Sequence, residues 1–229
     1  MTNETPIKNQ LVVKNLTHTY DDGQRKVEVL KGINVTFESG KLYAIVGESG
    51  GGKTTLLSLL SALDNIQSGD ILFNGTSTKK IGAQKFRLKY SNIVFQSFNL
   101  IKYMTARENV EVGIDFTGNK AGKSEKEYAY DLLEKVGITQ EESDRLVQRL
   151  SGGQQQRVAI ARSMAGDVPI ILADEPTGNL DEKTEGKVLE LFKALASSGK
   201  IVIVVTHSQK VATNADAIVY HMKDGKITK

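Results

Sequence analysis

The feature that most constrains the fold is a short glycine-rich run, residues 47–54, between an apolar stretch and a leucine-rich one. It reads Gly47, Glu48, Ser49, Gly50, Gly51, Gly52, Lys53 and Thr54, and it fits the pattern G-x-x-x-x-G-K-[ST]. The apolar residues 42–46 predict a strand before it, and the leucines of residues 56–60 predict a helix after it. A strand, such a loop and a helix in this order indicate a phosphate-binding loop in a protein of the α/β class.

The chemistry of this loop follows from its residue types. Glycines let the backbone curl so that N–H groups point at phosphate oxygens, and the helix that follows adds its positive N-terminal end. We expect Lys53 to reach the β- and γ-phosphates, Thr54 to place its hydroxyl on Mg²⁺, and Thr55 to belong to the same site. The alternative, a flexible glycine-rich turn, does not account for the flanking strand and helix.

An acidic pair at the end of another apolar run predicts the catalytic part of the site. Residues 170–173 read as a buried strand that leads into Asp174 and Glu175. Asp174 is expected to hold the Mg²⁺ ion, and Glu175 to polarise an attacking water. A solvated strand end is the simpler interpretation of such a pair, but the phosphate-binding loop upstream favours the catalytic one.

Short apolar runs that alternate with helical patterns predict a largely parallel sheet. The expected strands are residues 11–16, 27–37, 42–46, 70–73, 93–95, 170–173, 201–205, 217–221 and 226–228. Residues 201–205 show no polar alternation, which is typical of a central strand covered on both faces. Asp224 and Gly225 predict the hairpin turn before the last strand.

The middle of the chain has a helical pattern. Strand signals disappear over residues 105–150, and Ser124 with Glu127 forms a capping box at the start of a helix. Ser151 with Gln154 forms a second box, and a further helix is expected after Asp181. We therefore predict one domain over residues 1–229, with a core of residues 1–96 and 151–229 and a helical subdomain of about residues 97–150.

Composition excludes several classes of protein. The 229 residues suit one large domain, and 30 Lys and Arg against 27 Asp and Glu leave a net charge of +3, so we expect no nucleic-acid partner. With no cysteine, disulfides, thiolate metal sites and a cysteine nucleophile are excluded. The first 14 residues lack the apolar region of a secretory signal, and no apolar run approaches the roughly 18 residues of a membrane span. Any membrane role should therefore be peripheral.

Charge is unevenly distributed along the chain. Residues 71–107 contain seven Lys and Arg and no acidic residue, whereas residues 108–144 contain ten acidic residues and four lysines. Two interpretations stay open, namely two solvated faces of opposite sign and a docking surface for a partner.

A second motif, Leu150, Ser151, Gly152, Gly153 and Gln154, offers a hydroxyl and free N–H groups at a helix N-terminus, which is a second anion site. Together with residues 47–54 it resembles the ATP-binding cassette (ABC) ATPases over nearly the whole chain. The other family motifs match at Tyr20 (adenine stacking), Gln96 (Q-loop), Asp174 and Glu175, Asn179, Leu180 and Asp181 (D-loop), and His207 (switch histidine). Gly51 stands where many members have serine, which suggests a slightly altered nucleotide affinity.

The resemblance implies a P-loop NTPase core with a mainly parallel sheet, an antiparallel β subdomain and an inserted α-helical subdomain. It also implies a head-to-tail homodimer that sandwiches two ATP molecules, in which the signature of one copy, residues 151–154, caps the γ-phosphate held by the other. Glu175 would be the general base, His207 would contact the γ-phosphate, Gln96 would ligate Mg²⁺ and Asp181 would communicate between the two sites. A monomer should hydrolyse ATP poorly.

Within this family, residues 151–157 and 172–181 look like the branch of macrolide-exporter, lipoprotein-releasing, bacitracin-resistance and cell-division ATPases. This implies a bacterial ATPase subunit on the cytoplasmic face of the cell membrane, with permease subunits as partners, an extracytoplasmic adaptor as a further one, and peptide, antibiotic or lipoprotein as cargo. The alternative is a soluble ABC ATPase without a transport role. A scaffold without turnover is disfavoured because Glu175 and His207 are both present.

The expected contact with the permease lies in a groove between the two subdomains, near residues 96–107. Its aromatic and aliphatic residues are Phe98, Leu100, Ile101, Tyr103 and Met104, flanked by Lys102 and Arg107. Two interpretations stay open for them, packing between the subdomains and docking of the partner.

Overall fold

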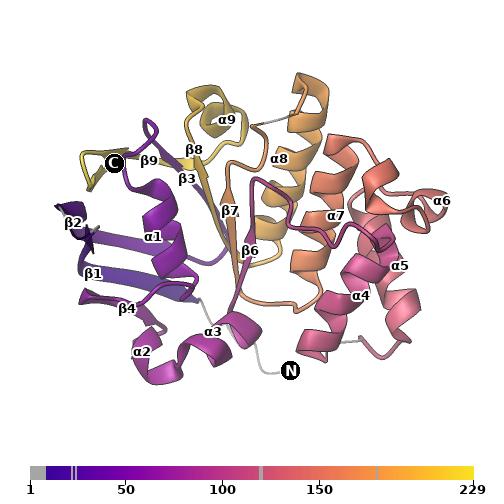
Figure 1. Ribbon diagram of the computed structural model, residues 1–229, viewed down its shortest axis with the longest axis horizontal. Coiled ribbons are helices and arrows are strands. Elements are labelled where there is room, and N and C mark those ends of the chain that lie inside the picture. Colours follow the sequence, from indigo (N-terminus) through magenta and orange to yellow (C-terminus); the bar gives the residue numbers. More distant parts are fainter. Residues whose placement is uncertain (1–8, 22, 24, 119–120, 179) are drawn as a thin grey trace, which may run out of the picture.

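The computed structural model describes residues 9–21, 23, 25–118, 121–178 and 180–229. A mainly parallel sheet runs through the middle of the molecule, with an antiparallel sheet on one side and a group of helices on the other (Figure 1). The expected fold class, a P-loop core with an antiparallel β part and an inserted helical part, is confirmed.

The central sheet has the strand order β10-β9-β3-β8-β7-β6. Its strands are β3 (Lys41–Val46), β6 (Ser91–Val94), β7 (Ile170–Asp174), β8 (Ile201–Thr206), β9 (Ile218–Lys223) and β10 (Lys226–Thr228). All neighbouring pairs are parallel except β9 and β10, which form the predicted hairpin through Asp224 and Gly225. Strand β8 is buried along its whole length, so the prediction of a central strand at residues 201–205 is confirmed.

Strand β8 separates two hydrophobic cores. Val202 and Val204 pack with the helices of the α-helical side, whereas Ile201, Ile203 and Val205 pack with the antiparallel sheet and α1 (Lys53–Leu60). Because successive side chains of a strand point to opposite faces, an uninterrupted apolar run is what a sheet covered on both sides requires.

The second sheet is antiparallel, in the order β2-β1-β4-β5. Its strands are β1 (Gln10–Asp21), β2 (Lys26–Glu38), β4 (Ser68–Phe73) and β5 (Thr76–Ser77). Strand β1 extends beyond the predicted end at Leu16, because residues 17–21 are mostly polar and lack an apolar pattern, whereas β2 matches its predicted range of residues 27–37 to within one residue at each end. The buried halves, with Leu11, Leu30 and Phe37, pack against α1.

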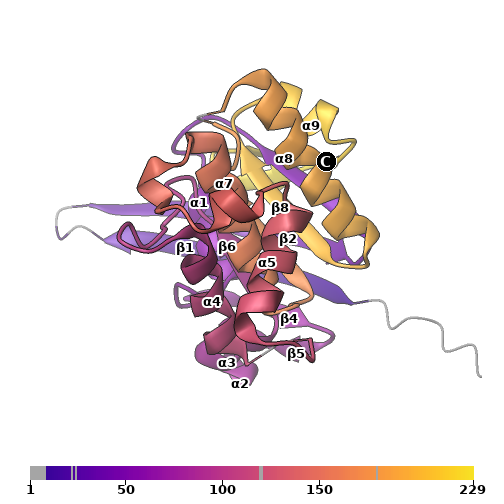
Figure 2. The same cartoon turned by 90° about the vertical axis from the view of Figure 1, so that its right-hand side faces the viewer.

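Two short helices, α2 (Thr78–Ile81) and α3 (Ala83–Lys89), are not predicted by the sequence pattern. In α2 only Thr78 is buried, and in α3 only Phe86 is buried, so neither helix shows an apolar stripe. They lie at the lower end of the molecule in both views and carry most of the basic residues of the 71–107 segment (Figure 2).

The helical region consists of α4 (Ala106–Thr117), α5 (Glu125–Lys135), α6 (Gln140–Ser143) and a 3₁₀ turn (Val147–Arg149), followed by α7 (Gly152–Met164). Each of the four α-helices begins with a capping box. The two predicted boxes, Ser124 with Glu127 and Ser151 with Gln154, are confirmed, and Thr105 with Glu108 and Thr139 with Glu142 are found in addition. Helices α8 (Glu182–Ser197) and α9 (Gln209–Asn214) complete the chain before β9.

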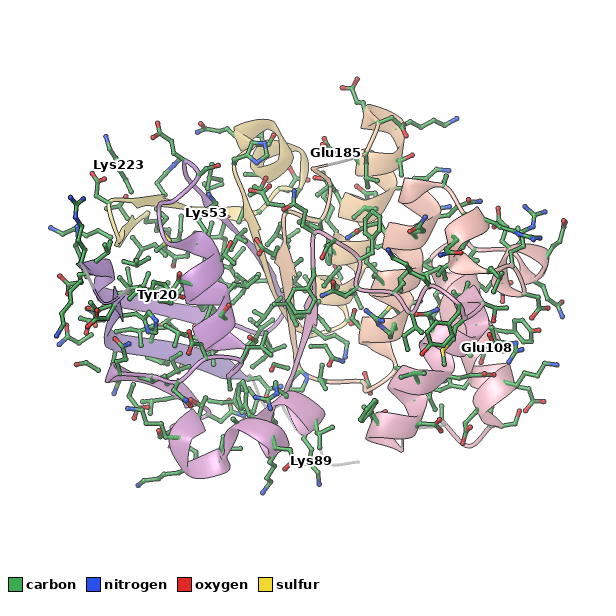
Figure 3. All side chains as sticks on the ribbon, in the orientation of Figure 1. Tyr20, Lys53, Lys89, Glu108, Glu185 and Lys223 are labelled. Atoms are coloured by element: carbon green, nitrogen blue, oxygen red, sulfur yellow. The ribbon has the colours of Figure 1, made fainter. Side chains whose placement is uncertain are left out.

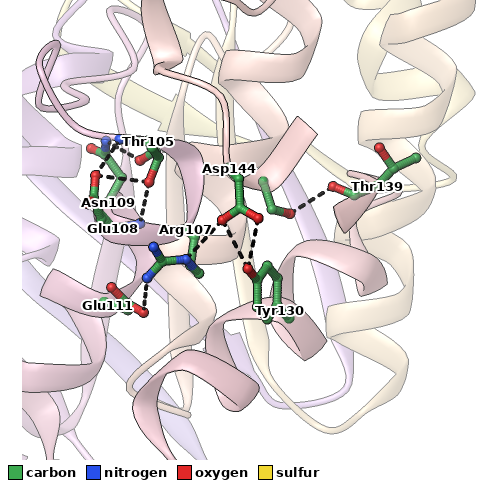
Figure 4. A network of polar contacts seen from close by, with 9 residues as sticks. Thr105, Arg107, Glu108, Asn109, Glu111, Tyr130, Thr139 and Asp144 are labelled. Carbon is green, nitrogen blue, oxygen red and sulfur yellow. Dashed lines mark hydrogen bonds and ion pairs between the residues drawn. The ribbon is translucent and has the colours of Figure 1, made fainter. Parts of the chain in front are cut away.

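An ion-pair network connects α4 to α5 and to the end of α6 (Figure 4). Arg107 donates to Glu111 over 2.5 Å and to Asp144 over 3.1 Å, and the Tyr130 hydroxyl donates to Asp144 over 2.9 Å. The hydrogen bond from Arg107 is the main reason that the pKa of Asp144 is lowered. Acidic side chains of this segment thus serve in helix caps and local ion pairs, which favours the interpretation of solvated faces.

No helix among the described residues is long and apolar enough to cross a bilayer.

Candidate nucleotide-binding site

The residues expected to bind nucleotide meet at one edge of the central sheet. Strands β3, β8, β7 and β6 are adjacent and parallel, so the segments that follow their carboxyl ends come together there. These segments bring the loop of residues 47–54, His207, Glu175 and Gln96 around a cavity of about 520 Å³. The cavity is lined by Tyr20, Val29, Ser49, Gly50, Gly52, Lys53, Thr54, Thr55, Gln96, Asp174, Glu175 and His207. Figure 3 labels Lys53 on α1 and Tyr20 on β1.

The glycines of the loop are required for two different reasons. A Cβ atom at Gly47 would overlap the carbonyl oxygen of Met222, and one at Gly52 would lie 2.9 Å from the carbonyl oxygen of Val29. Gly50 and Gly52 also have φ angles of 81° and 97°, which side chains disfavour. Gly51 is the least constrained of them, because its φ lies outside this region and a Cβ would sit 3.2 Å from the Glu48 carbonyl oxygen.

Lys53 is held over the curled loop. Its ammonium donates to the carbonyl oxygens of Gly47 and Glu48 over 2.7 and 2.9 Å, and the N–H of Gly51 donates to the Glu48 carbonyl over 3.2 Å. Gly47, Glu48 and Gly51 do not line the main cavity and instead border a neighbouring one of about 480 Å³ on the outer side of the loop.

The three residues expected to ligate Mg²⁺, namely Thr54, Asp174 and Gln96, border one cavity. The Thr54 hydroxyl is 3.5 Å from Asp174 Oδ1, and the exposed Gln96 side chain borders the same cavity. Among the described residues no group of three or more His, Asp or Glu side chains could hold a metal ion alone. This donor set fits Mg²⁺, which keeps several waters and binds through one or two carboxylates together with substrate phosphates. Burial raises the pKa of the Asp174 carboxyl, while the Thr54 hydroxyl lowers it in part.

Glu175 is held in a strained conformation by its neighbours. Its φ angle is 45°, although its backbone N–H continues the sheet by donating to the Val205 carbonyl over 3.0 Å. The Thr206 hydroxyl donates to Oε2 over 3.1 Å, and Nδ1 of His207 lies 3.0 Å from Oε1. For the second contact to be a hydrogen bond, Nδ1 carries the proton. The Glu175 side chain is 13% exposed and that of His207 is 60% exposed, so the carboxylate is enclosed while the histidine faces outward.

Tyr20 lies near the end of β1 and lines the same cavity. It is 46% exposed, and its hydroxyl is 3.4 Å from the Thr55 hydroxyl. Its ring meets the His18 ring edge-on at a centroid distance of 4.7 Å. An exposed aromatic ring fixed at its edge can present a face to a planar base.

The signature residues form a separate site. None of the described residues that line the main cavity comes from residues 151–154. Ser151 caps α7 by accepting from the N–H of Gln154, and the Gln154 amide also donates to Glu142 over 2.6 Å. No described atom lies within 4 Å of where a Cβ at Gly152 would be, apart from its own neighbourhood in the helix. The start of α7 is therefore open to an anion.

Asp181 also lies outside the main cavity. Its carboxylate caps α8 by accepting from the N–H of Thr184 over 3.1 Å and from the Thr184 hydroxyl over 2.7 Å. The Thr184 hydroxyl is the main reason that the pKa of Asp181 is lowered. Leu180 packs against the helical-side core, and Asn179, which the family pattern also includes, is outside the described residues.

The segment after Gln96 divides into a packed part and an exposed part. Phe98, Leu100 and the neighbouring Ile101 and Met104 are at least partly buried, and the first two pack against the helical-side core. Lys102 is exposed, and Tyr103 is 79% exposed. Arg107 is engaged in the network of Figure 4, so the packing interpretation holds for part of this segment and leaves Tyr103 and Lys102 at the surface.

Sequence reasoning missed two residues of the site. Thr206 is 2% exposed and orients Glu175, and Val29 lines the cavity beside Tyr20. A threonine between an apolar strand and His207 is a usable signal, because a polar residue at the carboxyl end of a buried strand reaches the site edge. Val29 has no such signal, since it reads as an ordinary strand residue.

We expect Gly47→Ala and Gly51→Ser to differ sharply in nucleotide affinity. The alanine meets the Met222 carbonyl and should weaken binding about a hundredfold, equivalent to about 3 kcal/mol of strain, whereas the serine should stay within about threefold. Titration calorimetry with ATP measures both, and circular dichroism checks that each variant is folded. Equal affinities for the two folded variants would contradict this account of the loop.

In chelator and without nucleotide, Asp174→Asn should raise the melting temperature at pH 7. Because burial raises the folded-state pKa of Asp174, its ionisation costs stability as pH rises from the ordinary value of about 3.9 through the folded pKa. The advantage of the variant should therefore shrink toward pH 4. The control is Asp115→Asn, an exposed carboxyl on α4. A difference in melting temperature between Asp174→Asn and the parent chain that does not change with pH would contradict the argument that burial raises the pKa of Asp174.

Comparison with known proteins identifies the family of this chain. The profile of the ABC transporter family matches residues 30–178. An uncharacterized ABC transporter ATP-binding protein of Bacillus subtilis, YclH, is 49% identical over 185 residues, which are 80% of this chain and 81% of the relative. The macrolide export ATP-binding/permease protein MacB of Mannheimia succiniciproducens is 39% identical over 225 residues, 96% of this chain but 34% of the exporter.

A solved structure extends the agreement to three dimensions. The uncharacterized ABC transporter ATP-binding protein MJ0796 of Methanocaldococcus jannaschii is 40% identical over 223 residues, 95% of this chain and 94% of the relative. Its dimeric structure matches with a TM-score of 0.86 at 37% identity, over 96% of this chain and 97% of the other, and a second dimeric structure is a post-hydrolysis state bound to ADP and Pi. This chain therefore belongs to the ABC transporter family and is a cassette ATPase with the P-loop fold.

Proposed function

We propose that this chain hydrolyses ATP as a head-to-tail homodimer and powers a bacterial membrane export or mechanotransmission complex. The observation that carries the proposal is the separation of two anion sites. The phosphate loop opens into a cavity with Asp174 and Glu175, while the start of α7 at Ser151 and Gly152 is exposed and does not border that cavity. A second copy can supply the missing helix end to each cavity.

Symmetry supports this arrangement. A two-fold axis places the same two surfaces of both copies against each other, so each loop of residues 47–54 would face the partner's residues 151–154, and two ATP molecules would be enclosed. The positive end of α7 and the N–H groups of Gly152 and Gly153 then suit a γ-phosphate. The two MJ0796 structures are dimeric, which supports a dimer of this chain as well.

The residues of one cavity divide the chemistry between them. Glu175 is the base that accepts the proton of the attacking water, with its two oxygens oriented by Thr206 and His207. Lys53 and the N–H groups of the loop bind the β- and γ-phosphates, and the ring of Tyr20 stacks on adenine. His207 contacts the γ-phosphate, and Asp181 carries information between the two sites.

Thr54, Asp174 and Gln96 would hold Mg²⁺ through their side-chain oxygens. When bound, this ion supplies positive charge that offsets the charge on the phosphate oxygens.

The chain would attach to permease subunits on the cytoplasmic face of the cell membrane, with the helical part of about residues 97–150 acting as a subdomain. A cavity of about 230 Å³ lies between α3 and β6 on one side and α4 and α7 on the other. Phe116, which is 73% exposed, borders this cavity, and Tyr103 is exposed as well. A partner would cover these aromatic side chains. A soluble ABC ATPase, the alternative, would leave them in water.

The cargo would be a peptide, an antibiotic or a lipoprotein, and an extracytoplasmic adaptor would complete the complex. The likeness to the macrolide export protein MacB supports export, since it extends over 96% of this chain.

Glu175→Gln should bind ATP normally and lower the hydrolysis rate roughly 10²- to 10⁴-fold, because the amide cannot accept the water proton. The variant should also accumulate as a dimer when ATP is present, which light scattering after gel filtration detects. The control is Glu190→Gln, an exposed carboxylate of α8 outside the cavity. Turnover at the parent rate would remove Glu175 from the role of base, and a monomer at saturating ATP would argue against the sandwich.

The docking surface is tested with Tyr103→Ala combined with Lys102→Glu. This variant should lose co-purification with the permease of the same gene cluster while its ATPase rate without the permease is unchanged, because both side chains are exposed and outside the nucleotide cavity. Arg107 is left intact, since its replacement would break the ion pairs to Glu111 and Asp144. Co-purification at the parent level would place the contact elsewhere.

A further inference from the structure

We propose that Thr184 is a positioning residue that couples Gly153 of the signature to Asp181 of the D-loop within one chain. The proposal rests on the proposed head-to-tail dimer, in which the signature of one copy faces the nucleotide of the other and Asp181 carries information between the two sites. Thr184 lies in the first turn of α8, next to the start of α7.

The two branches of the Thr184 side chain have different partners. The hydroxyl donates to Asp181 Oδ2 over 2.7 Å. The methyl carbon Cγ2 lies too close to the position of a Gly153 Cβ to leave room for one, and the three atoms nearest to that position all belong to Thr184. Gly153 is not in the left-handed region, so its lack of a side chain serves this close approach and not an unusual backbone conformation.

This arrangement is stiff. A β-branched side chain has few allowed χ1 rotamers, and here both groups on Cβ are in use, so Thr184 cannot rotate away from Gly153 without releasing Asp181. A displacement of the Asp181 carboxylate therefore moves the methyl group against the first turn of α7. The same turn carries Ser151 and Gln154, and Gln154 is bonded in turn to Glu142 of the helical region.

Capping of α8 does not explain the choice of threonine. The backbone N–H of Thr184 already donates to Asp181 Oδ1 over 3.1 Å, and any residue at this position would provide that bond. What the side chain adds is the connection between the two helix starts. It thereby gives the D-loop of one copy a direct mechanical contact with the signature that the same copy presents to its partner.

Four variants of the full chain separate the effect of the Thr184 hydroxyl from the effect of its methyl group. Thr184→Val keeps the shape and loses the hydroxyl, Thr184→Ser keeps the hydroxyl and loses the methyl group, Gly153→Ala introduces the clash, and the double variant Gly153→Ala/Thr184→Ser removes it again. For each, steady-state ATPase measurements give kcat and KM, and thermal melts check folding.

Gly153→Ala should lower kcat about tenfold or more, and the double variant should recover to within about threefold of Thr184→Ser alone. Thr184→Val should lower kcat about fivefold without a change in KM or melting temperature. A double variant no faster than Gly153→Ala, or Thr184→Val at the parent rate, would overturn the proposal.

Dimerisation separates this result from the proposed function. Glu175→Gln that stays monomeric with ATP speaks against the sandwich dimer. If Glu175→Gln dimerises with ATP but the double variant Gly153→Ala/Thr184→Ser does not recover its kcat, the coupling role of Thr184 is wrong and the sandwich dimer stands.

Discussion

The close packing of the phosphate loop against the backbone of its neighbours is the constraint on which the site depends. Gly47 lies against the Met222 carbonyl of β9, and Gly52 against the Val29 carbonyl of β2. These oxygens leave no room for a side chain at either glycine, and Lys53 is held over the loop by donating to the carbonyl oxygens of Gly47 and Glu48. The loop thus requires both sheets, the parallel one that carries it and the antiparallel one that supports it.

The remaining chemistry is placed by strand order and has a cost in stability. Burial disfavours the ionised form of Asp174, and Glu175 has a left-handed backbone conformation. Asp174 ends β7 and Glu175 follows it, and residues 170–173 of this strand are buried beside β8. Strained and desolvated groups persist where a rigid core fixes them, and here two hydrophobic cores meet on the two faces of β8. On the helical side, helix caps and ion pairs between nearby residues add to the hydrophobic core.

Much of the fold could be predicted because its signals are local. The apolar run of β8, the hairpin at Asp224 and the box of Ser151 with Gln154 depend on neighbouring residues and appear as the patterns predict. Helices α2 and α3 could not be predicted, since their burial comes from a few contacts with distant segments. The roles of Phe98 and Tyr103 were equally open, because an apolar residue in a loop packs or projects according to which element lies above it.

The sequence by itself determined the residue types of the phosphate loop, the acidic pair and the signature, because each is a contiguous motif whose chemistry lies in its own atoms. Only the tertiary structure decided which of them share a cavity. It brings Glu175, His207 and Gln96 to the loop through adjacent parallel strands, and it places residues 151–154 apart from them. It also joins Gly153 to Asp181 through Thr184, since contacts between helix starts distant in sequence depend on how α7 and α8 pack.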